Sequence, residues 1–152
     1  MDTTLIKQLV DDIQNLFTVT ETNEQNEVIE SYEVMVKEKY EIYPKITYPG
    51  VTIEEILNED DNRYFDETER VSNMGYQFAI YAEQSEEKTA VQNVRELASR
   101  IDTYLKGPRY RCLRRLGSLT IVPHPNDNNV MIGYLRYECA FRLDINTIYR
   151  RY

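Results

Sequence analysis

The chain has 152 residues, the length of one domain with a buried core. No apolar run approaches the ~20 residues needed to cross a bilayer. The opening Met1-Asp2-Thr3-Thr4 lacks the basic segment of a secretory signal, so we expect synthesis in the cytoplasm and no membrane partner. Cys112 and Cys139 have no metal-binding spacing, and reduced, buried thiols are favoured over a disulfide or a nucleophile.

The net charge of −8 is unevenly distributed along the chain. Residues 1–87 contain 6 basic and 21 acidic residues, a net charge of −15, whereas residues 88–152 contain 12 basic and 5 acidic residues, a net charge of +7. One end of the molecule is therefore expected to be acidic and the other basic. Such a molecule is suited to head-to-tail self-association or to differently charged partners, unless both ends are simply solvated.

The first 42 residues are predicted to form a helical N-terminal segment. Apolar residues recur at helical spacing between residues 3 and 17. They are Leu5, Ile6, Leu9, Ile13, Leu16 and Phe17. Residues 18–27 are polar and indicate a linker or a helix start. Residues 28–40 favour a second helix, although the contiguous Val34, Met35 and Val36 leave a strand open.

Two contrasting segments follow. Residues 43–50, Tyr-Pro-Lys-Ile-Thr-Tyr-Pro-Gly, are predicted to be extended, and the prolines confine them to a sheet edge or the start of a strand. Residues 54–69 are dense in carboxylates. We expect an exposed acidic loop there, with one helical turn at residues 53–57. The spacing does not match a calcium-binding loop.

The stretch from Tyr76 to Ile145 organises the domain. Residues 76–83 alternate as a strand, and residues 86–106 follow a helical period, with Ser85 as the expected N-cap and Gly107-Pro108 as the stop. A long hairpin, residues 109–122 and 135–145 with a kink signal at Gly117, closes the stretch.

The predicted fold class is therefore α+β. We expect a mixed or antiparallel sheet of about four strands with helices packed on one face. Residues 1–152 form one domain, with a sheet-plus-helix core at 43–146 and a C-terminal tail at 147–152. Phe141 is expected to be buried between the sheet and the long helix.

The hairpin register makes a further prediction. A turn at Pro125-Asn126 places Cys112 opposite Cys139 on the apolar face. The other face then carries two opposed pairs of arginines, Arg109 with Arg142 and Arg115 with Arg136. Like charges across a ladder are destabilising. Either the bulge at Gly117 separates them, or an anionic partner covers them, or they are solvated. The acidic segment of a neighbouring subunit could supply that partner through Glu67 and Glu69, which makes these six charged residues a candidate subunit interface.

No motif predicts catalysis, a cofactor or a metal. The single histidine, His124, lies between two prolines, and nothing near it in sequence supplies a second ligand or a carboxylate partner. Nucleotide-binding glycine loops and the nucleophile elbow are absent from the sequence. We therefore do not expect an enzyme.

The order of these elements resembles a known family. The sequence runs from an amphipathic helix through the Tyr-Pro-Lys-Ile-Thr-Tyr segment, an acidic loop, the 77–81 strand Gln-Phe-Ala-Ile-Tyr and a long helix to the closing 137–144 strand Tyr-Glu-Cys-Ala-Phe-Arg-Leu-Asp. Over residues 43–146 this pattern is similar to the tail terminator, or tail completion, proteins of long-tailed bacteriophages. These are also called minor capsid or minor tail proteins.

The resemblance implies a structural virion protein. Such subunits form a homo-oligomeric ring, usually a hexamer, which ends the tail tube and joins it to the head or neck. The implied partners are other copies of the chain, the tail tube protein, the head or neck connector, and packaged DNA in the lumen. The implied location is the virion, after assembly in the host cytoplasm.

Two alternatives remain. Residues 18–40 are longer than that family usually needs, which leaves another head–tail joining or neck ring as an alternative to the tail terminator. A nucleic-acid-binding module is the rival from a different class, and its candidate residues are Arg109, Arg111, Arg114, Arg115, Arg136 and Arg142.

Overall fold

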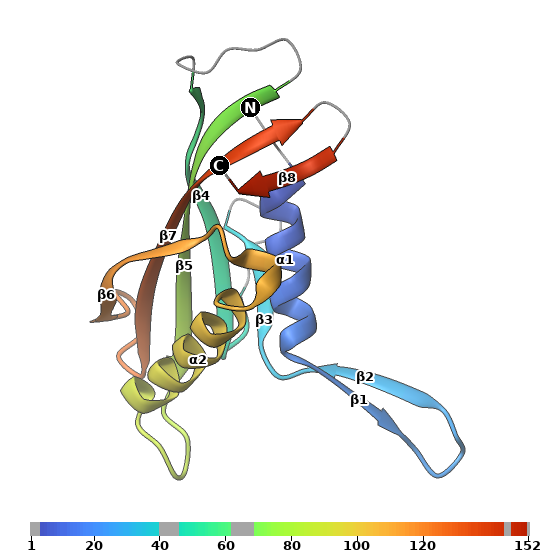
Figure 1. The fold of residues 1–152 in the computed structure, drawn as a ribbon. Helices are drawn as coiled ribbons and strands as arrows, with labels where there is room; N and C mark the ends of the chain where they lie inside the picture. Colours follow the sequence, from blue (N-terminus) through green and yellow to red (C-terminus); the bar gives the residue numbers. More distant parts are fainter. Residues whose placement is uncertain (1–3, 40–45, 62–68, 145–146, 152) are drawn as a thin grey trace.

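The computed structural model describes residues 4–39, 46–61, 69–144 and 147–151. In chain order the elements are α1 (Thr4–Leu16), β1 (Thr18–Thr22), β2 (Val28–Tyr32), β3 (Met35–Glu38), β4 (Gly50–Asp61), β5 (Glu69–Glu83), α2 (Ala90–Leu105), the 3-10 turn η2 (Pro108–Tyr110), β6 (Arg114–Pro123), β7 (Val130–Asp144) and β8 (Thr147–Arg151) (Figure 1). In this part of the chain, neither helix is long and apolar enough to cross a membrane.

Most strands belong to one mixed sheet. Its order is β3-β4-β5-β7-β6, and β8 pairs with the far end of β7. β3 runs parallel to β4, and the other neighbours are antiparallel. The predicted α+β class with a mixed sheet is confirmed. The count of about four strands is too low, because in the described part of the chain this sheet has six strands and β1 and β2 form a separate two-stranded sheet.

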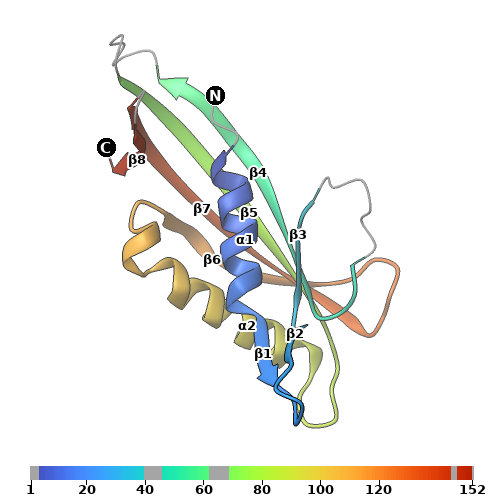
Figure 2. The same ribbon diagram turned by 90° about the vertical axis from the view of Figure 1, so that its right-hand side faces the viewer.

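Both helices cover the same face of the sheet, as predicted (Figure 2). Alternate residues of β5, among them Tyr76, Phe78 and Ile80, point to that face and are fully buried. α1 packs on β3 and β4, and α2 packs on β5 and β7. The apolar period of each helix therefore continues the apolar face of the central strands.

The N-terminal segment differs from the prediction after α1. Residues 28–40 are not a helix, because Val28–Tyr32 pairs antiparallel with Thr18–Thr22 and Met35–Glu38 joins the edge of the main sheet. Val36 packs in the core beside Val51 of β4. The contiguous apolar residues therefore indicated a buried strand, and the helical spacing was fortuitous. The predicted linker at 18–27 is instead a strand and the turn of a hairpin.

The acidic region is also a strand where it is described. Residues 50–61 form β4 and pair with β5 along their length, with a bulge between Glu55 and Leu57. Val51 and Ile53 are fully buried, which favours a strand despite the flanking carboxylates. The predicted helical turn at 53–57 is wrong. Residues 46–49 belong to no helix or strand, and residues 40–45 and 62–68 lie outside the described structure.

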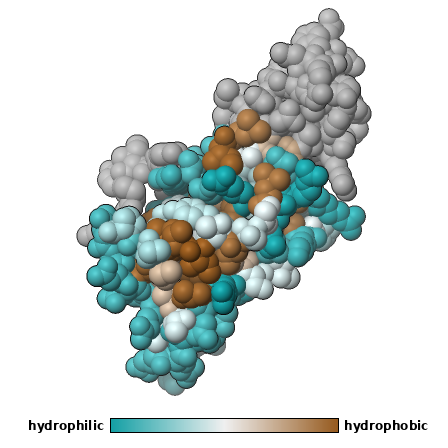
Figure 3. All heavy atoms as spheres, turned by 90° about the vertical axis from the view of Figure 1, so that its left-hand side faces the viewer, coloured by the Kyte–Doolittle hydropathy of each residue, from teal (hydrophilic) through white to brown (hydrophobic). Residues whose placement is uncertain are grey.

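The long hairpin is confirmed as β6 and β7. β7 has 15 residues, and β6 forms an edge of the sheet. Figure 3 views the molecule from the side on which β6 lies in Figure 1, and apolar side chains gather there among polar ones. Within β6, Leu116 is exposed, whereas Leu119, Ile121 and Val122 are half-buried. Residues 147–151, predicted as a tail, extend the sheet as β8.

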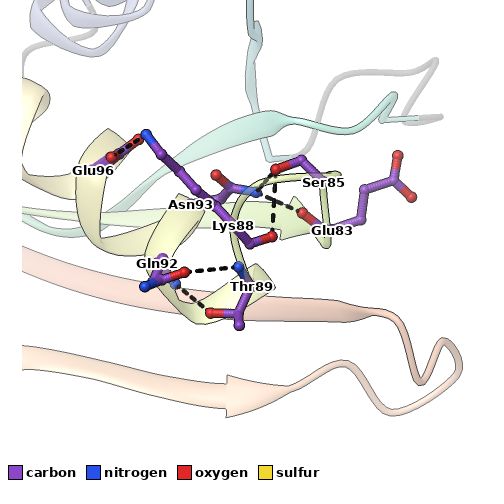
Figure 4. A network of polar contacts seen from close by, with 7 residues as sticks. All are labelled: Glu83, Ser85, Lys88, Thr89, Gln92, Asn93 and Glu96. Atoms are coloured by element: carbon purple, nitrogen blue, oxygen red, sulfur yellow. Dashed lines mark hydrogen bonds and ion pairs between the residues drawn. The ribbon is translucent and has the colours of Figure 1, made fainter.

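Helix α2 begins four residues later than predicted. Thr89, rather than Ser85, is its N-cap: the Thr89 hydroxyl accepts from the Gln92 amide, and the Gln92 side chain accepts from the Thr89 amide (Figure 4). This reciprocal pair satisfies two amides that the helix leaves open. Ser85 instead donates to the carbonyl of Lys88, while Asn93 reaches back to the carbonyl of Glu83. These bonds tie the end of β5 to the start of α2.

Close packing between α2 and β7 depends on Gly133. A Cβ at this position would lie 2.4 Å from Val94 Cγ1 and 3.2 Å from Leu119 Cδ1. We expect Gly133→Ala to lower the free energy of unfolding by roughly 2 kcal/mol, because a branched side chain in a packed core gives way poorly. In the double variant, Val94→Ala should remove much of the cost of Gly133→Ala, because the methyl group that the new Cβ meets is then absent. Urea unfolding of both single variants and the double variant measures the coupling, and strictly additive losses would contradict this packing.

Candidate subunit interface

The arginines predicted to crowd one face are separated. In the observed register Arg115 lies opposite Tyr137, Leu116 lies opposite Arg136, and Arg114 lies opposite Glu138. The predicted register is wrong by one residue at this end. The turn lies further along the chain than predicted, since Pro123 pairs with Met131, and this shifts the register by three residues. The bulge between Leu116 and Thr120, where Gly117 has a φ of 69°, reverses two of those three. The bulge at Gly117 is present, but the arginines are separated by the position of the turn and by the placement of Arg109 outside the strand. Arg114 instead forms an ion pair with Glu138, at 2.9 Å.

Two of the predicted interface arginines contact acidic residues of their own chain. Arg109 is not in a strand but in η2, where its Nε lies 2.7 Å from Asp12 Oδ2 of α1. Arg115 points to the helix-covered face, where its Nη1 lies 3.4 Å from Asp102 Oδ2 of α2. Both side chains therefore stabilise contacts between elements of one subunit.

The remaining candidates are spread over the sheet. Arg136 donates through Nε to Gln77 Oε1 at 2.8 Å on the face away from the helices. The Arg142 backbone pairs with Val71 and Arg150, so it is not opposite Arg109. Glu69 begins β5, and its side chain is outside the described structure, as are those of Arg142 and Phe141 and the whole of Glu67. Among the side chains that the structure describes, none of the predicted charge pairs is brought together, and the role of these residues between subunits stays a prediction.

A buried carboxylate joins α2 to the hairpin. Asp102 is 8% exposed; its Oδ1 accepts from the Tyr137 hydroxyl at 2.7 Å, and its Oδ2 lies 3.0 Å from Lys106 Nζ. Burial opposes ionisation of Asp102, but the Tyr137 hydrogen bond and the cations Lys106 and Arg115 outweigh it and lower the pKa of Asp102. Burial and the bond to Asp102 raise the pKa of Tyr137. The cluster is a fixed structural contact between the two layers.

A second tyrosine–carboxylate pair joins α1 to η2. The buried Tyr110 hydroxyl donates to Asp12 Oδ2, the atom that also pairs with Arg109. Burial, together with this bond, raises the pKa of Tyr110. Sequence reasoning did not assign either aspartate, because an acid at a helix position adjoining an apolar face looks like a solvated residue until the fold supplies its partner.

The single histidine packs against two tyrosines and caps a turn. His124 is half-buried at the β6–β7 turn; its ring lies 6.5 Å from that of Tyr48 and 6.3 Å from that of Tyr81. Its Nδ1 accepts from the Asn126 amide at 3.1 Å, as expected for a turn residue.

The two thiols contact each other without the ladder pairing that was predicted. Cys112 lies in the turn before β6, whereas Cys139 lies in β7, and both are half-buried rather than buried. The hydrogen bond to Cys112, followed by burial, raises the pKa of Cys139. Across residues 4–39, 46–61, 69–144 and 147–151 there is no group of three or more histidine, cysteine or acidic side chains that could hold a metal ion.

The hairpin of β1 and β2 projects from the body of the molecule (Figure 1). We call residues 18–32 the arm. Its base is held firmly: the Glu33 amide donates to the Phe17 carbonyl at 2.9 Å, Glu33 pairs with Arg100 at 2.9 Å, and Thr18 Oγ1 donates to the Gln14 carbonyl. Arg100 also lies over the buried Phe17 ring, 4.7 Å from its centroid. The arm therefore leaves the body in a defined direction.

The tip of the arm is also well formed. Asn23 Oδ1 accepts from the amides of Gln25 and Glu27, both at 2.9 Å. Asn26 has a φ of 59°, a conformation that asparagine tolerates better than most residues. The turn thus has a specific sequence cause. Together with the β-branched run Thr-Val-Thr at 18–20, this asparagine-rich turn is the signal that would have predicted the hairpin.

The arm exposes apolar side chains that nothing described in the structure covers. Val28 is 66% exposed, Ile29 50% and Tyr32 65%. Val28 and Tyr32 share one face of the hairpin, and Ile29 lies on the other. Exposure on both faces of a two-stranded sheet is typical of an element that becomes covered on binding.

The opposite edge of the main sheet has the complementary chemistry. We call β6 with the preceding Arg111 the β6 edge. Arg111 is exposed, and Arg114 is 77% exposed at its side chain although it pairs with Glu138. Leu116 adds an apolar side chain that is 39% exposed. Within the described residues no strand pairs with the outer side of β6, so this edge offers backbone groups, two arginines and apolar area.

Comparison with known proteins does not assign a family. No model of a protein family matches the chain. A search of curated proteins likewise finds no similar sequence. Function is therefore inferred from the geometry of the molecule and from the resemblance drawn from its sequence.

Proposed function

We propose that this protein is a structural subunit of a closed ring at the end of a phage tail tube, where it terminates the tail and joins it to the head or neck. The observation that carries the proposal is the projecting arm, an ordered hairpin fixed at its base with apolar side chains on both faces. An element of this kind contributes little to the core of its own subunit. It is suited to contact between subunits.

The shape of the sheet supports the same proposal. β5 and β7 have 15 residues each, longer than the usual 5–6 residues of a strand. Their far ends, with β4 and β8, extend beyond the region covered by α2 (Figure 2). A subunit with a helix-covered core, a long sheet and an arm presents several surfaces for matching to neighbours. These include other copies of the chain, the tail tube and the head connector.

A nucleic-acid-binding role is less well supported. Three of the six arginines that would form such a surface pair with acidic residues of the same chain: Arg109 with Asp12, Arg114 with Glu138 and Arg115 with Asp102. Binding to a phosphate backbone depends on cations that remain available to it. The net charge of −8 also opposes approach to nucleic acid.

The proposal predicts a closed oligomer. Native mass spectrometry of the full chain, from micromolar to millimolar concentration, should show a single dominant stoichiometry. Negative-stain images should show rings with a central opening. Addition of duplex DNA at low and high salt should leave that stoichiometry unchanged. A chain that stays monomeric throughout and is absent from purified tailed virions would overturn the proposal, and salt-dependent DNA binding by that monomer would favour the nucleic-acid alternative.

A further inference from the structure

We infer that the arm of one copy docks against the β6 edge of a second copy of this chain. The inference deepens the proposed function, on which it rests, by naming the two surfaces that meet within the ring. It follows from the exposed apolar area of the arm, from charge complementarity, and from the positions of the two surfaces on the molecule.

The arm needs a partner for physical reasons. An isolated two-stranded hairpin is only marginally stable in water, and a third strand or a packed face is what usually stabilises it. The arm has neither within the described structure, because β1 and β2 pair only with each other. Val28, Ile29 and Tyr32 remain at least half exposed. Docking on an apolar strand edge would bury them.

The charges select the β6 edge as the partner surface. Residues 18–32 contain four glutamates and no basic residue, whereas residues 106–117 contain five basic residues and no acidic one. Within the same chain, Arg109 already pairs with Asp12, and both Lys106 and Arg115 already pair with Asp102. Arg111 is exposed, and Arg114 keeps a side chain that is 77% exposed although it pairs with Glu138, so both can meet the carboxylates of a neighbour. Within the described structure, Glu21 and Glu30 make no ion pair.

The two surfaces lie on opposite sides of the subunit. The arm leads into β3, which is one edge of the sheet, and β6 is the other edge. Figure 1 shows the arm projecting to one side and β6 lying on the opposite side. An arm therefore reaches away from the β6 edge of its own subunit. Contact between two different surfaces on opposite sides is head-to-tail, which closes into a ring when the rotation between subunits permits.

Charge reversal in two complementary variants tests the pairing. Glu21→Lys/Glu30→Lys gives the arm a basic surface, and Arg111→Glu/Arg114→Glu gives the β6 edge an acidic one. Each variant alone should lose assembly by roughly tenfold or more, because like charges then face each other. An equimolar mixture should recover assembly, since every arm then meets an oppositely charged edge. The mixture must alternate, so native mass spectrometry should show only even-numbered rings. Glu86→Lys/Glu87→Lys, with the same change in net charge as the arm variant but away from both surfaces, is the matched control and should assemble normally.

A second measurement locates the contact directly. In the full chain, Tyr32 is replaced by the photo-crosslinking residue p-benzoylphenylalanine, and isotopically labelled and unlabelled copies are mixed at millimolar concentration. Crosslinks between copies should map to residues 109–123. Crosslinks within one copy, crosslinks to another segment, or none between copies would overturn the inference.

The outcomes separate this inference from the proposed ring. If the wild type forms rings and both charge-reversed variants form them equally well, the proposed ring is supported and the docking of the arm on the β6 edge is refuted. Arm-to-edge crosslinks from a protein that forms no ring would uphold the docking and count against the ring.

Discussion

Phe78→Ala is expected to lower the free energy of unfolding by about 3–5 kcal/mol, the range for truncating a fully buried aromatic side chain. Phe78 lies on β5 in the centre of the sheet and is 0% exposed. Its ring meets that of Tyr137 edge-on, with centroids 5.4 Å apart. The truncation removes buried apolar area, leaves a cavity and breaks this aromatic contact. Urea unfolding followed by circular dichroism measures the change through the midpoint at constant slope.

Tyr32→Ala is the matched control for Phe78→Ala. It removes an aromatic ring of similar size from the arm, where the side chain is 65% exposed. Its effect on the stability of the monomer should stay within about 0.5 kcal/mol. Equal losses in the two variants would show that the arm is part of the core. A loss below about 1 kcal/mol in Phe78→Ala would show that the apolar face of β5 has been assigned to the wrong side of the sheet.

The middle of the chain could be predicted from sequence because local signals there agree with one another. Residues 76–83 alternate, residues 90–105 keep a helical period, and Gly107 with Pro108 stops the helix. Each signal acts over a few residues and needs no distant partner. The α+β class and the placement of the helices on one face followed from these patterns.

Errors arose where distant residues decide the structure. Val34 to Val36 became a strand because β4 offers a parallel partner, which no local pattern reveals. The acidic residues 54–61 also lie in a strand, because residues 71–77 of β5 pair with them across the bulge between Glu55 and Leu57. The density of carboxylates predicted an exposed loop, but alternation lets the sheet bury Val51 and Ile53 while nearby carboxylates meet solvent or a cation such as Lys39.

The candidate interface failed in its details for a related reason. Register in a hairpin depends on the position of the turn as well as on each bulged residue. The turn lies further along the chain than predicted, with Pro123 opposite Met131, and the resulting register puts Arg115 on the helix-covered face beside Asp102. Gly117 predicted the bulge, but the packed structure sets the size of the register shift. The charge asymmetry of the chain was the more durable observation, because it depends on composition and survives such shifts.

Asp102 is the buried acid on which Tyr137, Lys106 and Arg115 converge. Asp102→Ala should lower the free energy of unfolding at neutral pH by about 3 kcal/mol. This is the low end of the range for breaking a buried pair, because Lys106 and Arg115 remain partly hydrated. The loss arises chiefly from the Tyr137 hydroxyl, which is left buried without its acceptor.

The pH dependence of stability gives Asp102 a signature that truncation of packing alone would not give. Its pKa is lower in the folded than in the unfolded state, so the folded state favours the ionised form. The resulting stabilisation is fully present above the unfolded-state value of about 3.9 and is lost as the pH falls through the folded-state value. The difference in stability between wild type and Asp102→Ala should therefore shrink as the pH is lowered below about 4. Glu96→Gln, at the exposed Lys88 pair on the same helix, should show almost no difference at any pH. A gap between wild type and Asp102→Ala that stays constant from neutral to acidic pH would mean that Asp102 stabilises the fold by packing, without its charge.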